Sequence, residues 1–469
     1  MGFKYSGFIS TWGGELFYYS DCAVIGFNIR KAVIERKWAE AEHRSLLPNT
    51  GCITASSAAV RAGCEGGGSR CAVQAGLKKL DPERHGIIIT TIREMLVCAV
   101  NMETFSDVLL VTANLGSLFD QVSAQTIRSY KPKFIALHFQ EVGGKDYTDN
   151  MCHAQDFFEN IESSEEMKDF DRVCTYVDNQ FQAEDSFTAL GSIYFIHKTL
   201  KNIYQYDFNV KDFKAVSGQK KHMGSLDGFK WSRKGFMRTR WIIHNQGLDL
   251  VNVHLFHDAS NLIACNSSPS IYSANRKNAL RYVISRISDS CYTPMPFFLF
   301  GDFNFRLDTQ SLVQHLSTSA DVQTVKKDSS NEVQKIICEE KDNDHQVLLH
   351  IEEKLFTYLH QAVFREDSGK ALLKYDKEAA AFHDVIREED ITFPPSYPYS
   401  EDDTKPTQYM NTRCPAWCDR ILMSHTAQEI IQKREDGERN VVYNTMGSNI
   451  CMGDHKPVFL FFSLKTNDH

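Results

Sequence analysis

The sequence predicts an α/β fold of stacked sheets and helices over residues 105–464, and three observations support this. Short apolar runs rich in Val, Ile, Phe and Leu recur along this stretch, which is typical of strands buried on both faces. Amphipathic helical patterns lie between the runs, and strands that alternate with such helices form layered α/β structures. The composition, 42% hydrophobic and 24% charged over 469 residues, is that of an ordinary globular protein.

The candidate strands share a length of about four to eight residues and strong enrichment in large apolar side chains. In chain order they are DVLLVTAN (107–114), KFIALHFQE (133–141), FTALGSIYFI (187–196), LDLVNVHLF (248–256), FFLFGDFN (297–304), CDRILMS (418–424) and PVFLFFSL (457–464). Apolar residues at three- and four-residue spacing predict helices over 272–289 and 344–364. The stretch FPPSYPYSEDDTKP (393–406) predicts a long irregular surface loop.

Residues 1–104 differ from the rest and are expected to form an N-terminal extension that is linker-like and poorly ordered, apart from a helix around 30–47. The glycine-rich stretch 54–71 contains Gly66-Gly67-Gly68, which suggests either a phosphate-binding loop or a linker. A phosphate-binding loop needs a preceding strand, a following helix and a lysine within it, and none of these is evident in the sequence. We therefore favour the linker. Residues 465–469 are expected to be a short tail.

Charge and cysteine usage narrow the function classes. The formal net charge is −8, which does not favour a nucleic-acid binder, because such a protein needs a broad basic surface. The 13 cysteines show no metal-binding spacing and are expected to be reduced thiols of an intracellular protein. No run reaches the ~20 apolar residues of a membrane span, so no transmembrane segment is predicted.

Polar side chains gather at the ends of the candidate strands. Each one alone has an ordinary explanation, such as a turn-forming Asn, an ion-paired Glu or a buried core His. Together they supply amide, carboxylate and imidazole groups at positions where α/β folds place their chemistry. These residues are Asn114, Glu141, His254, Asp302, Asn304, Asp419, Asp454 and His455.

This combination predicts a hydrolase that uses one magnesium ion. Mg²⁺ prefers a few oxygen ligands and keeps several waters, so Glu141 and Asn114 are the natural ligands. The histidines are then available to donate hydrogen bonds to a charged group. A carboxylate from Asp419 or Asp454 would orient His455.

Three motifs give the sequence a family resemblance: GDFNFRLD (301–308), RCPAWCDRIL (413–422) and GDHKPV (453–458). Together they resemble the inositol polyphosphate 5-phosphatases, most closely the type I members, in the superfamily that includes DNase I and exonuclease III. The similarity extends from about residue 107 to 462. It implies a four-layer DNase I-like sandwich, with two central β-sheets flanked by helices.

The implied activity is magnesium-dependent removal of the 5-phosphate from inositol 1,4,5-trisphosphate and inositol 1,3,4,5-tetrakisphosphate, which terminates calcium-mobilising signalling. The implied protein is a monomer, located in the cytoplasm or peripherally at the plasma membrane. Type I members carry a prenylated C-terminal cysteine, whereas this sequence ends in SLKTNDH, so membrane attachment is not assigned.

The resemblance also implies roles for individual residues. The metal glutamate is Glu141, with Asn114 beside it, and Asp454 completes the metal site. Asp302 activates water. The remaining implied roles are phosphate binding by Asn304, hydrogen bonding by His254 of NVHL, and orientation of His455 by Asp419.

Cationic side chains are needed for the substrate phosphates. SRKGFMRTR (232–240) offers several, and alternation along a strand would place Arg238 and Arg240 on one face, unless this is only a solvated basic edge. We predict that Lys234 and Arg413 contact phosphate. Members that act on lipids often carry Lys where this sequence has Asn411, which favours soluble inositol polyphosphates.

Two other functions compete with this interpretation. A nuclease of the same superfamily would share Glu141, Asp302 and His455, but the acidic charge and PAWCDRIL argue against it. A non-catalytic scaffold is disfavoured because every expected catalytic residue type is present. The preference between the tris- and tetrakisphosphate, and activity on phosphoinositide lipids, stay open.

Overall fold

The structure is a computed structural model of the chain. It describes residues 8–12, 15–20, 23–27, 107–116, 132–182, 186–217, 227–231, 233–288, 291–328, 332–341, 345–432 and 440–465. The chain divides into two units, Met1–Lys79 and Leu80–His469.

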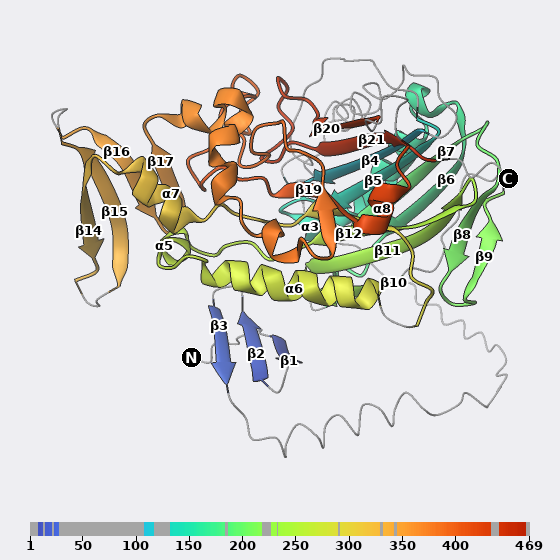
Figure 1. Ribbon diagram of the computed structural model, residues 1–469, viewed down its shortest axis with the longest axis horizontal. Coiled ribbons are helices and arrows are strands. Elements are labelled where there is room, and N and C mark those ends of the chain that lie inside the picture. The colour runs from blue at the N-terminus through green and yellow to red at the C-terminus, as the bar shows by residue number, and fades with distance from the viewer. Residues whose placement is uncertain are drawn as a thin grey trace, which may run out of the picture. The chain divides into compact units, whose positions relative to one another are not determined.

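The first unit contains a small antiparallel sheet that the sequence analysis did not predict. Its strands are β1 (Phe8–Trp12), β2 (Glu15–Ser20) and β3 (Ala23–Phe27), paired in that order and coloured blue in Figure 1. The helix expected around 30–47 and the glycine-rich stretch 54–71 lie outside the described residues. The division of the chain at residue 104 stays a prediction.

Two large sheets form the centre of the second unit. The six-stranded sheet has the order β20 (Val441–Thr445), β21 (Val458–Ser463), β4 (Asp107–Asn114), β5 (Phe134–Gln140), β7 (Gly191–His197) and β6 (Phe170–Val177). The eight-stranded sheet has the order β18 (Ile386–Glu388), β19 (Asp419–Ser424), β13 (Phe297–Asp302), β12 (Gln246–His254), β11 (Lys234–Ile243), β8 (Ile203–Asp207) and β9 (Asp212–Ala215), with β10 (Asp227–Trp231) paired to β11. The apolar runs found in the sequence correspond to β4, β5, β7, β12, β13, β19 and β21.

The main hydrophobic core lies between these two sheets. Leu110 and Phe134 of the six-stranded sheet share one buried cluster with Leu250 and Phe300 of the eight-stranded sheet. The rings of Phe298 and Phe462 stack across the interface with centroids 5.1 Å apart. Central strands are therefore buried on both faces, which explains why β4, β5 and β13 read as continuous apolar runs.

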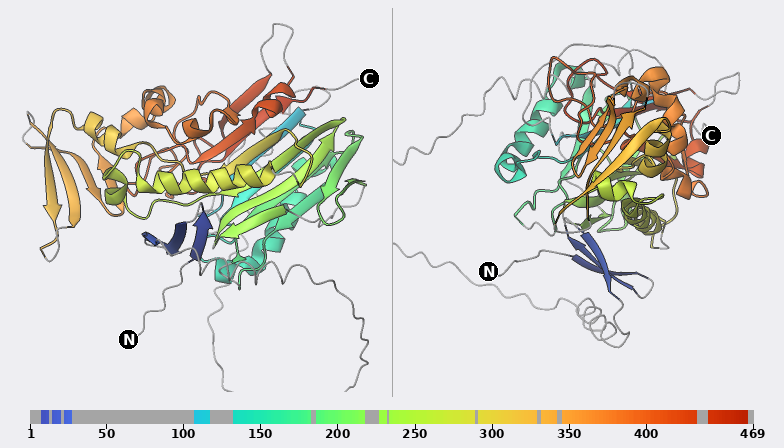
Figure 2. Two further views of the ribbon diagram at one scale, coloured as in Figure 1. Left: turned by 60° about the horizontal axis from the view of Figure 1, so that its bottom comes forward. Right: turned by 90° about the vertical axis from the view of Figure 1, so that its left-hand side faces the viewer.

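Helices cover the outer faces of both sheets. On α4 (Ala154–Glu162), Phe157 and Phe158 pack against Phe139 of the six-stranded sheet at centroid distances of 5.7 and 5.8 Å. α6 (Ile271–Ile287) is capped by Ser270 and packs its buried face, including Leu280, on the eight-stranded sheet. The two helices lie on opposite sides of the paired sheets (Figure 2). The order helix, sheet, sheet, helix confirms the predicted four-layer sandwich.

The remaining α-helices of the described residues are short. They are α3 (Tyr147–Asn150), α5 (Asn261–Cys265), α7 (Thr309–Leu316) and α8 (His425–Glu429). No helix in the described part of the chain has the length and apolar character needed to cross a bilayer.

The helix predicted over residues 344–364 is wrong. Most of this stretch forms the hairpin of β16 (Val347–Glu352) and β17 (Leu355–Tyr358), in a four-stranded sheet with β14 (Ala320–Lys326) and β15 (Val333–Glu340), at the left of Figure 1. Alternate residues are buried, among them Leu349 and Ile351. Glu352 pairs with Leu355 across a two-residue turn, so the apolar spacing has period two rather than the helical period.

The loop at 393–406 is irregular as predicted, but it does not lie wholly on the surface. Phe393, Ser396 and Tyr399 are buried. The indole Nε1 of Trp417 donates to the carbonyl of Phe393 at 2.9 Å, and Ser396 Oγ donates to Asp419 Oδ2 at 2.7 Å. These bonds draw the first half of the loop onto the end of β19.

Candidate active site

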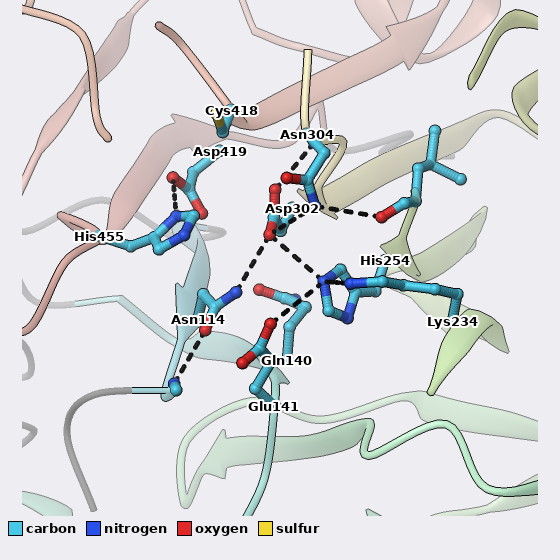
Figure 3. A network of polar contacts seen from close by, with 12 residues as sticks. Asn114, Gln140, Glu141, Lys234, His254, Asp302, Asn304, Cys418, Asp419 and His455 are labelled. Atoms are coloured by element: carbon cyan, nitrogen blue, oxygen red, sulfur yellow. Dashed lines mark hydrogen bonds and ion pairs between the residues drawn. The ribbon is translucent and has the colours of Figure 1, made fainter. Parts of the chain in front are cut away.

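Strand register brings most of the predicted site residues to one edge of the two sheets. β4 and β5 are parallel, so Asn114 pairs with Gln140 and Glu141 follows directly. In the other sheet β12 and β13 are parallel, and His254 pairs with Asp302. β19 runs antiparallel to β13, which places its first residue, Asp419, opposite Asp302. Segments far apart in the sequence therefore meet at this edge (Figure 3).

Asp302 lies at the centre of the contacts. Its Oδ2 accepts a hydrogen bond from Asn114 Nδ2 at 3.0 Å, which joins the two sheets. His254 Nε2 lies 3.3 Å from the same oxygen, 3.7 Å from Glu141 Oε1 and 2.5 Å from Lys234 Nζ. His254 thus contacts both carboxylates, and Lys234 reaches the cluster through its contact with His254 (Figure 3).

Two site residues adopt a left-handed backbone. Glu141 and Asn304 both have φ of +53°. Asn tolerates this region well, whereas for a residue such as Glu it costs on the order of 1 kcal/mol. Hydrogen bonds on both sides hold the turn at Glu141: Leu115 N donates to Gln140 O at 2.8 Å, and Val142 N donates to Ala189 O at 2.9 Å. The strained turn directs the Glu141 carboxylate toward His254 and Lys234.

The charges in this cluster support one another. Burial by itself would raise the pKa of Glu141, but Lys234, and after it His254, more than offset this and lower it to about 2. Burial would likewise raise the pKa of Asp302, yet the hydrogen bond from His254 and the charge of His455 hold it well below its usual range. Burial lowers the pKa of Lys234 to about 8 and also lowers that of His254. At neutral pH the two carboxyl groups are therefore anionic.

His455 and Asp419 form a second pair beside Asp302. His455 Nδ1 donates to Asp419 Oδ2 at 2.8 Å, and Ser396 Oγ donates to the same oxygen. Burial alone would lower the pKa of His455, but the Asp419 carboxylate raises it to about 10, so the imidazole is protonated. The ring of Tyr397 packs on His455 with centroids 4.5 Å apart. Sequence reasoning missed Ser396 and Tyr397, because a Ser and a Tyr in an irregular loop carry no recognisable signal.

Asn304 is fully engaged by its neighbours. Its backbone N donates to Asp302 Oδ1 at 2.8 Å, and its Nδ2 donates to Asp302 Oδ2 at 3.0 Å and to the carbonyl of Leu255 at 3.1 Å. Its Oδ1 accepts from Arg306 Nη2 at 2.7 Å. Sequence reasoning gave Arg306 no role, although it lies inside the quoted motif GDFNFRLD.

The oxygen-rich edge fits a divalent cation. A Cβ atom on Gly116 would lie 2.6 Å from Glu141 Oε2 and 3.2 Å from Asn114 Oδ1, so these two oxygens border the space that glycine leaves free. Such oxygens are suitable ligands for a hard cation. A different group, Asp302, Asp419 and His455, also offers ligand atoms that all lie within 4.8 Å of one another.

Asp454, the third predicted metal ligand, does not belong to that compact group. Its side chain is partly exposed, and its backbone carbonyl accepts from Tyr399 N at 2.8 Å. Its assignment as a metal ligand stays a prediction.

The candidate phosphate-binding cations lie in different surroundings. Arg238 and Arg240 do share a face, but they are buried and both pair with Asp249, at 2.8 and 2.7 Å. They therefore neither face a substrate nor form a solvated basic edge. Arg413 is partly exposed and donates to Asn261 Oδ1 at 2.9 Å and to the carbonyl of Glu353 at 3.0 Å.

Comparison with known proteins identifies the family. The sequence model described as Endonuclease/Exonuclease/phosphatase family 2 matches residues 101–361 and 360–461. The chain is 50% identical over 383 residues to inositol polyphosphate-5-phosphatase A of Homo sapiens, covering 76% of this chain and 93% of that protein. It is 34% identical over 416 residues to a probable type I inositol 1,4,5-trisphosphate 5-phosphatase of Caenorhabditis elegans, covering 76% and 99%.

Among solved structures, the inositol polyphosphate 5-phosphatase domain of SPsynaptojanin, in complex with inositol (1,4)-bisphosphate and calcium ion, matches with a TM-score of 0.40 and 14% identity, covering 82% of this chain and 91% of that one. The assignment rests on the family match and the two sequence relatives. The chain therefore belongs to the inositol polyphosphate 5-phosphatases, enzymes of the endonuclease/exonuclease/phosphatase family.

Proposed function

We propose that this protein removes the 5-phosphate from inositol 1,4,5-trisphosphate and inositol 1,3,4,5-tetrakisphosphate with Mg²⁺ as its metal cofactor, and so ends a calcium-mobilising signal. The observation that carries the proposal is the meeting of Glu141, Asp302 and His455 at one edge of the sandwich. The 50% identity to an inositol polyphosphate-5-phosphatase and the name of the nematode relative support the substrate class.

Glu141 and Asn114 would hold the metal ion, with Asp454 as the third ligand. The side-chain oxygens of Glu141 and Asn114 border the free space beside Gly116. Asp454 lies in the irregular segment that precedes β21. When bound, Mg²⁺ supplies positive charge that stabilises the negative charge of the transferring phosphoryl group.

Asp302 is the proposed base for the attacking water. Its carboxylate accepts a hydrogen bond from the water and takes a proton as the new P–O bond forms. Burial alone would raise the pKa of Asp302. In the free protein the hydrogen bond from His254 and the charge of His455 hold it low. A phosphate anion placed beside it would raise that pKa, because like charge disfavours the ionised form, and Asp302 would become a better base.

Protonated His455 is the proposed donor to the phosphoryl oxygens. Its Nδ1–H is used by Asp419, so Nε2–H is the proton that it offers to substrate. Asn304 would join as a phosphate contact by exchanging its 3.1 Å bond to the Leu255 carbonyl for a phosphoryl oxygen. Preorganised donors of this kind stabilise developing charge without reorganisation during the reaction.

Lys234 and Arg413 are the proposed cations for substrate phosphates, with His254 as a further contact. Lys234 keeps most of its charge at neutral pH, since its pKa is about 8. Every group in this scheme comes from one chain, which is consistent with a monomer. The thiols of Cys152, Cys174, Cys265, Cys338, Cys414 and Cys418 are free, which supports a cytoplasmic location, where thiols stay reduced.

The test is phosphate release from soluble inositol 1,4,5-trisphosphate, with and without Mg²⁺, beside the tetrakisphosphate, vesicles of phosphatidylinositol 4,5-bisphosphate, and plasmid DNA. We expect metal-dependent release from both soluble substrates and intact DNA. Nicked plasmid without phosphate release would overturn the proposal in favour of a nuclease. Equal release in the presence of a chelator would overturn the metal assignment.

A further inference from the structure

Arg306 is a buried cation beside the catalytic cluster, and within the described residues no acidic side chain forms an ion pair with it. It is 8% exposed. Its Nη2 donates to Asn304 Oδ1 at 2.7 Å, while Nε and Nη1 are buried and make no hydrogen bond with the described residues. Burying a guanidinium with unsatisfied donors is costly, so its position calls for a functional explanation.

The contact with Asn304 determines which way that amide faces. An asparagine side chain can rotate by half a turn and exchange its oxygen and nitrogen. In the observed orientation Nδ2 faces Asp302 Oδ2 and the carbonyl of Leu255, both of which are acceptors. A guanidinium carries only donors, so it donates to the Oδ1 end of the amide and repels the NH₂ end. The rotated amide would also place its oxygen against the Asp302 carboxylate.

A flat aromatic surface holds the guanidinium in place. Its Cζ lies 4.5 Å from the ring centroid of Tyr397, in the geometry of a cation–π contact. The backbone N of Arg306 donates to Glu378 Oε1 at 3.0 Å, which fixes the start of the side chain. The direction of the Nη2 bond is therefore set by structure outside the catalytic residues.

We propose that Arg306 is a positioning residue that acts through Asn304, selecting the amide orientation in which Nδ2 faces Asp302 and the reacting phosphate. Its unpaired nitrogens are covered, so it does not touch substrate itself. This inference rests on the proposed function.

Double-mutant kinetics test the inference on inositol 1,4,5-trisphosphate. Arg306→Met should lower kcat by about 30-fold with KM within about 3-fold, whereas the same change in an Asn304→Ala background should lower kcat by less than about 3-fold. Arg306→Lys keeps the charge but not the planar fork, so it should not restore kcat. Losses that multiply in the double variant, or full activity in Arg306→Lys, would overturn the inference.

Arg172 provides the matched control. It is buried to the same degree, 7% exposed, and donates Nη2 to the carbonyls of His197 and Leu200 at 2.9 and 2.7 Å on β6, the edge strand of the other sheet. Arg172→Met should lower the unfolding temperature while leaving kcat within about 2-fold. An equal loss of kcat in Arg172→Met and Arg306→Met would show a general structural effect and would overturn the positioning role.

A spectroscopic readout separates this inference from the proposed function. In protein labelled with ¹⁵N-asparagine, the side-chain NH₂ signal of Asn304 is assigned by its absence from Asn304→Ala. Its protons should exchange slowly with water in the wild type and at least about 10-fold faster in Arg306→Lys. Unchanged exchange would overturn the inference even if the enzyme is active, whereas a wild type that releases no phosphate would overturn only the proposed function.

Discussion

Because His138 is buried, the free energy of unfolding should depend on pH in the acid range. Replacing His138 should remove part of that dependence. The imidazole is fully buried on β5, stacks on Phe300 of β13 at a centroid distance of 3.6 Å, and bonds to the hydroxyl of Tyr194 at 2.9 Å. Burial lowers its pKa from 6.5 to about 3. The folded state therefore keeps it neutral under conditions where the unfolded chain takes up a proton.

The magnitude follows from linkage. Because the folded-state pKa is the lower one, the unfolded state binds more protons between about pH 6.5 and pH 3, and stability falls as the pH decreases through this range. The loss is about 1.4 kcal/mol for each pH unit, or ~2 kcal/mol between pH 7.5 and pH 5. Above pH 6.5 both states hold His138 neutral, and its contribution does not change.

The assay is urea unfolding of the wild type and His138→Gln at pH 7.5, 6.5, 5.5 and 5.0. The variant should be less stable at pH 7.5, and the difference in unfolding free energy should shrink by ~2 kcal/mol at pH 5. His345→Gln is the control, because it makes the same substitution at a side chain that is 73% exposed instead of buried. A constant difference between wild type and His138→Gln over the whole range would refute the reasoning.

Three further predictions concern the site and its support. Gly116→Ala places a Cβ 2.6 Å from Glu141 Oε2, so the Mg²⁺ concentration for half-maximal activity should rise at least ~10-fold in a metal titration; an unchanged midpoint would contradict the metal assignment. Asp302→Ala should lower kcat at least ~10³-fold with a native circular dichroism spectrum, and near-normal turnover would remove Asp302 from its role. Asp249→Ala removes the buried carboxylate that pairs with both Arg238 and Arg240 and should cost ~3–5 kcal/mol in urea unfolding; KM should stay unchanged, and a selective rise in KM would mean that these arginines do face substrate.

Much of the sandwich could be predicted because its strands are buried on both faces. Continuous apolar runs such as DVLLVTAN mark β4 almost to the residue. Polar residues at the ends of the runs, such as Asn114 and Asp302, were expected to converge, and these two are hydrogen-bonded between the two sheets. The motifs supplied the family, and the family match and relatives agree with it. The catalytic and ligand roles of these residues stay proposals.

The spacing of apolar residues could not decide between helix and strand where both structures fit the same spacing. In residues 344–364 the apolar positions fit both a helix and a hairpin. Pairing with β15 decided for strands, because it buries Leu349 and Ile351 on one face. Alternation correctly placed Arg238 and Arg240 together, but only the neighbouring strand, which carries Asp249, determined that this face is buried.

The strand runs, the layered fold class and the amides, acids and imidazoles at strand ends could be predicted from the amino-acid sequence alone, because these depend on periodicity and residue chemistry within short segments. The packing of the complete chain was needed to show that Ser396 donates to Asp419, that Tyr397 contacts both Arg306 and His455, and that Arg306 donates to Asn304. Those contacts join a loop, a strand end and a turn that are distant along the chain. Their geometry is set by how the layers pack, and no short segment encodes that packing.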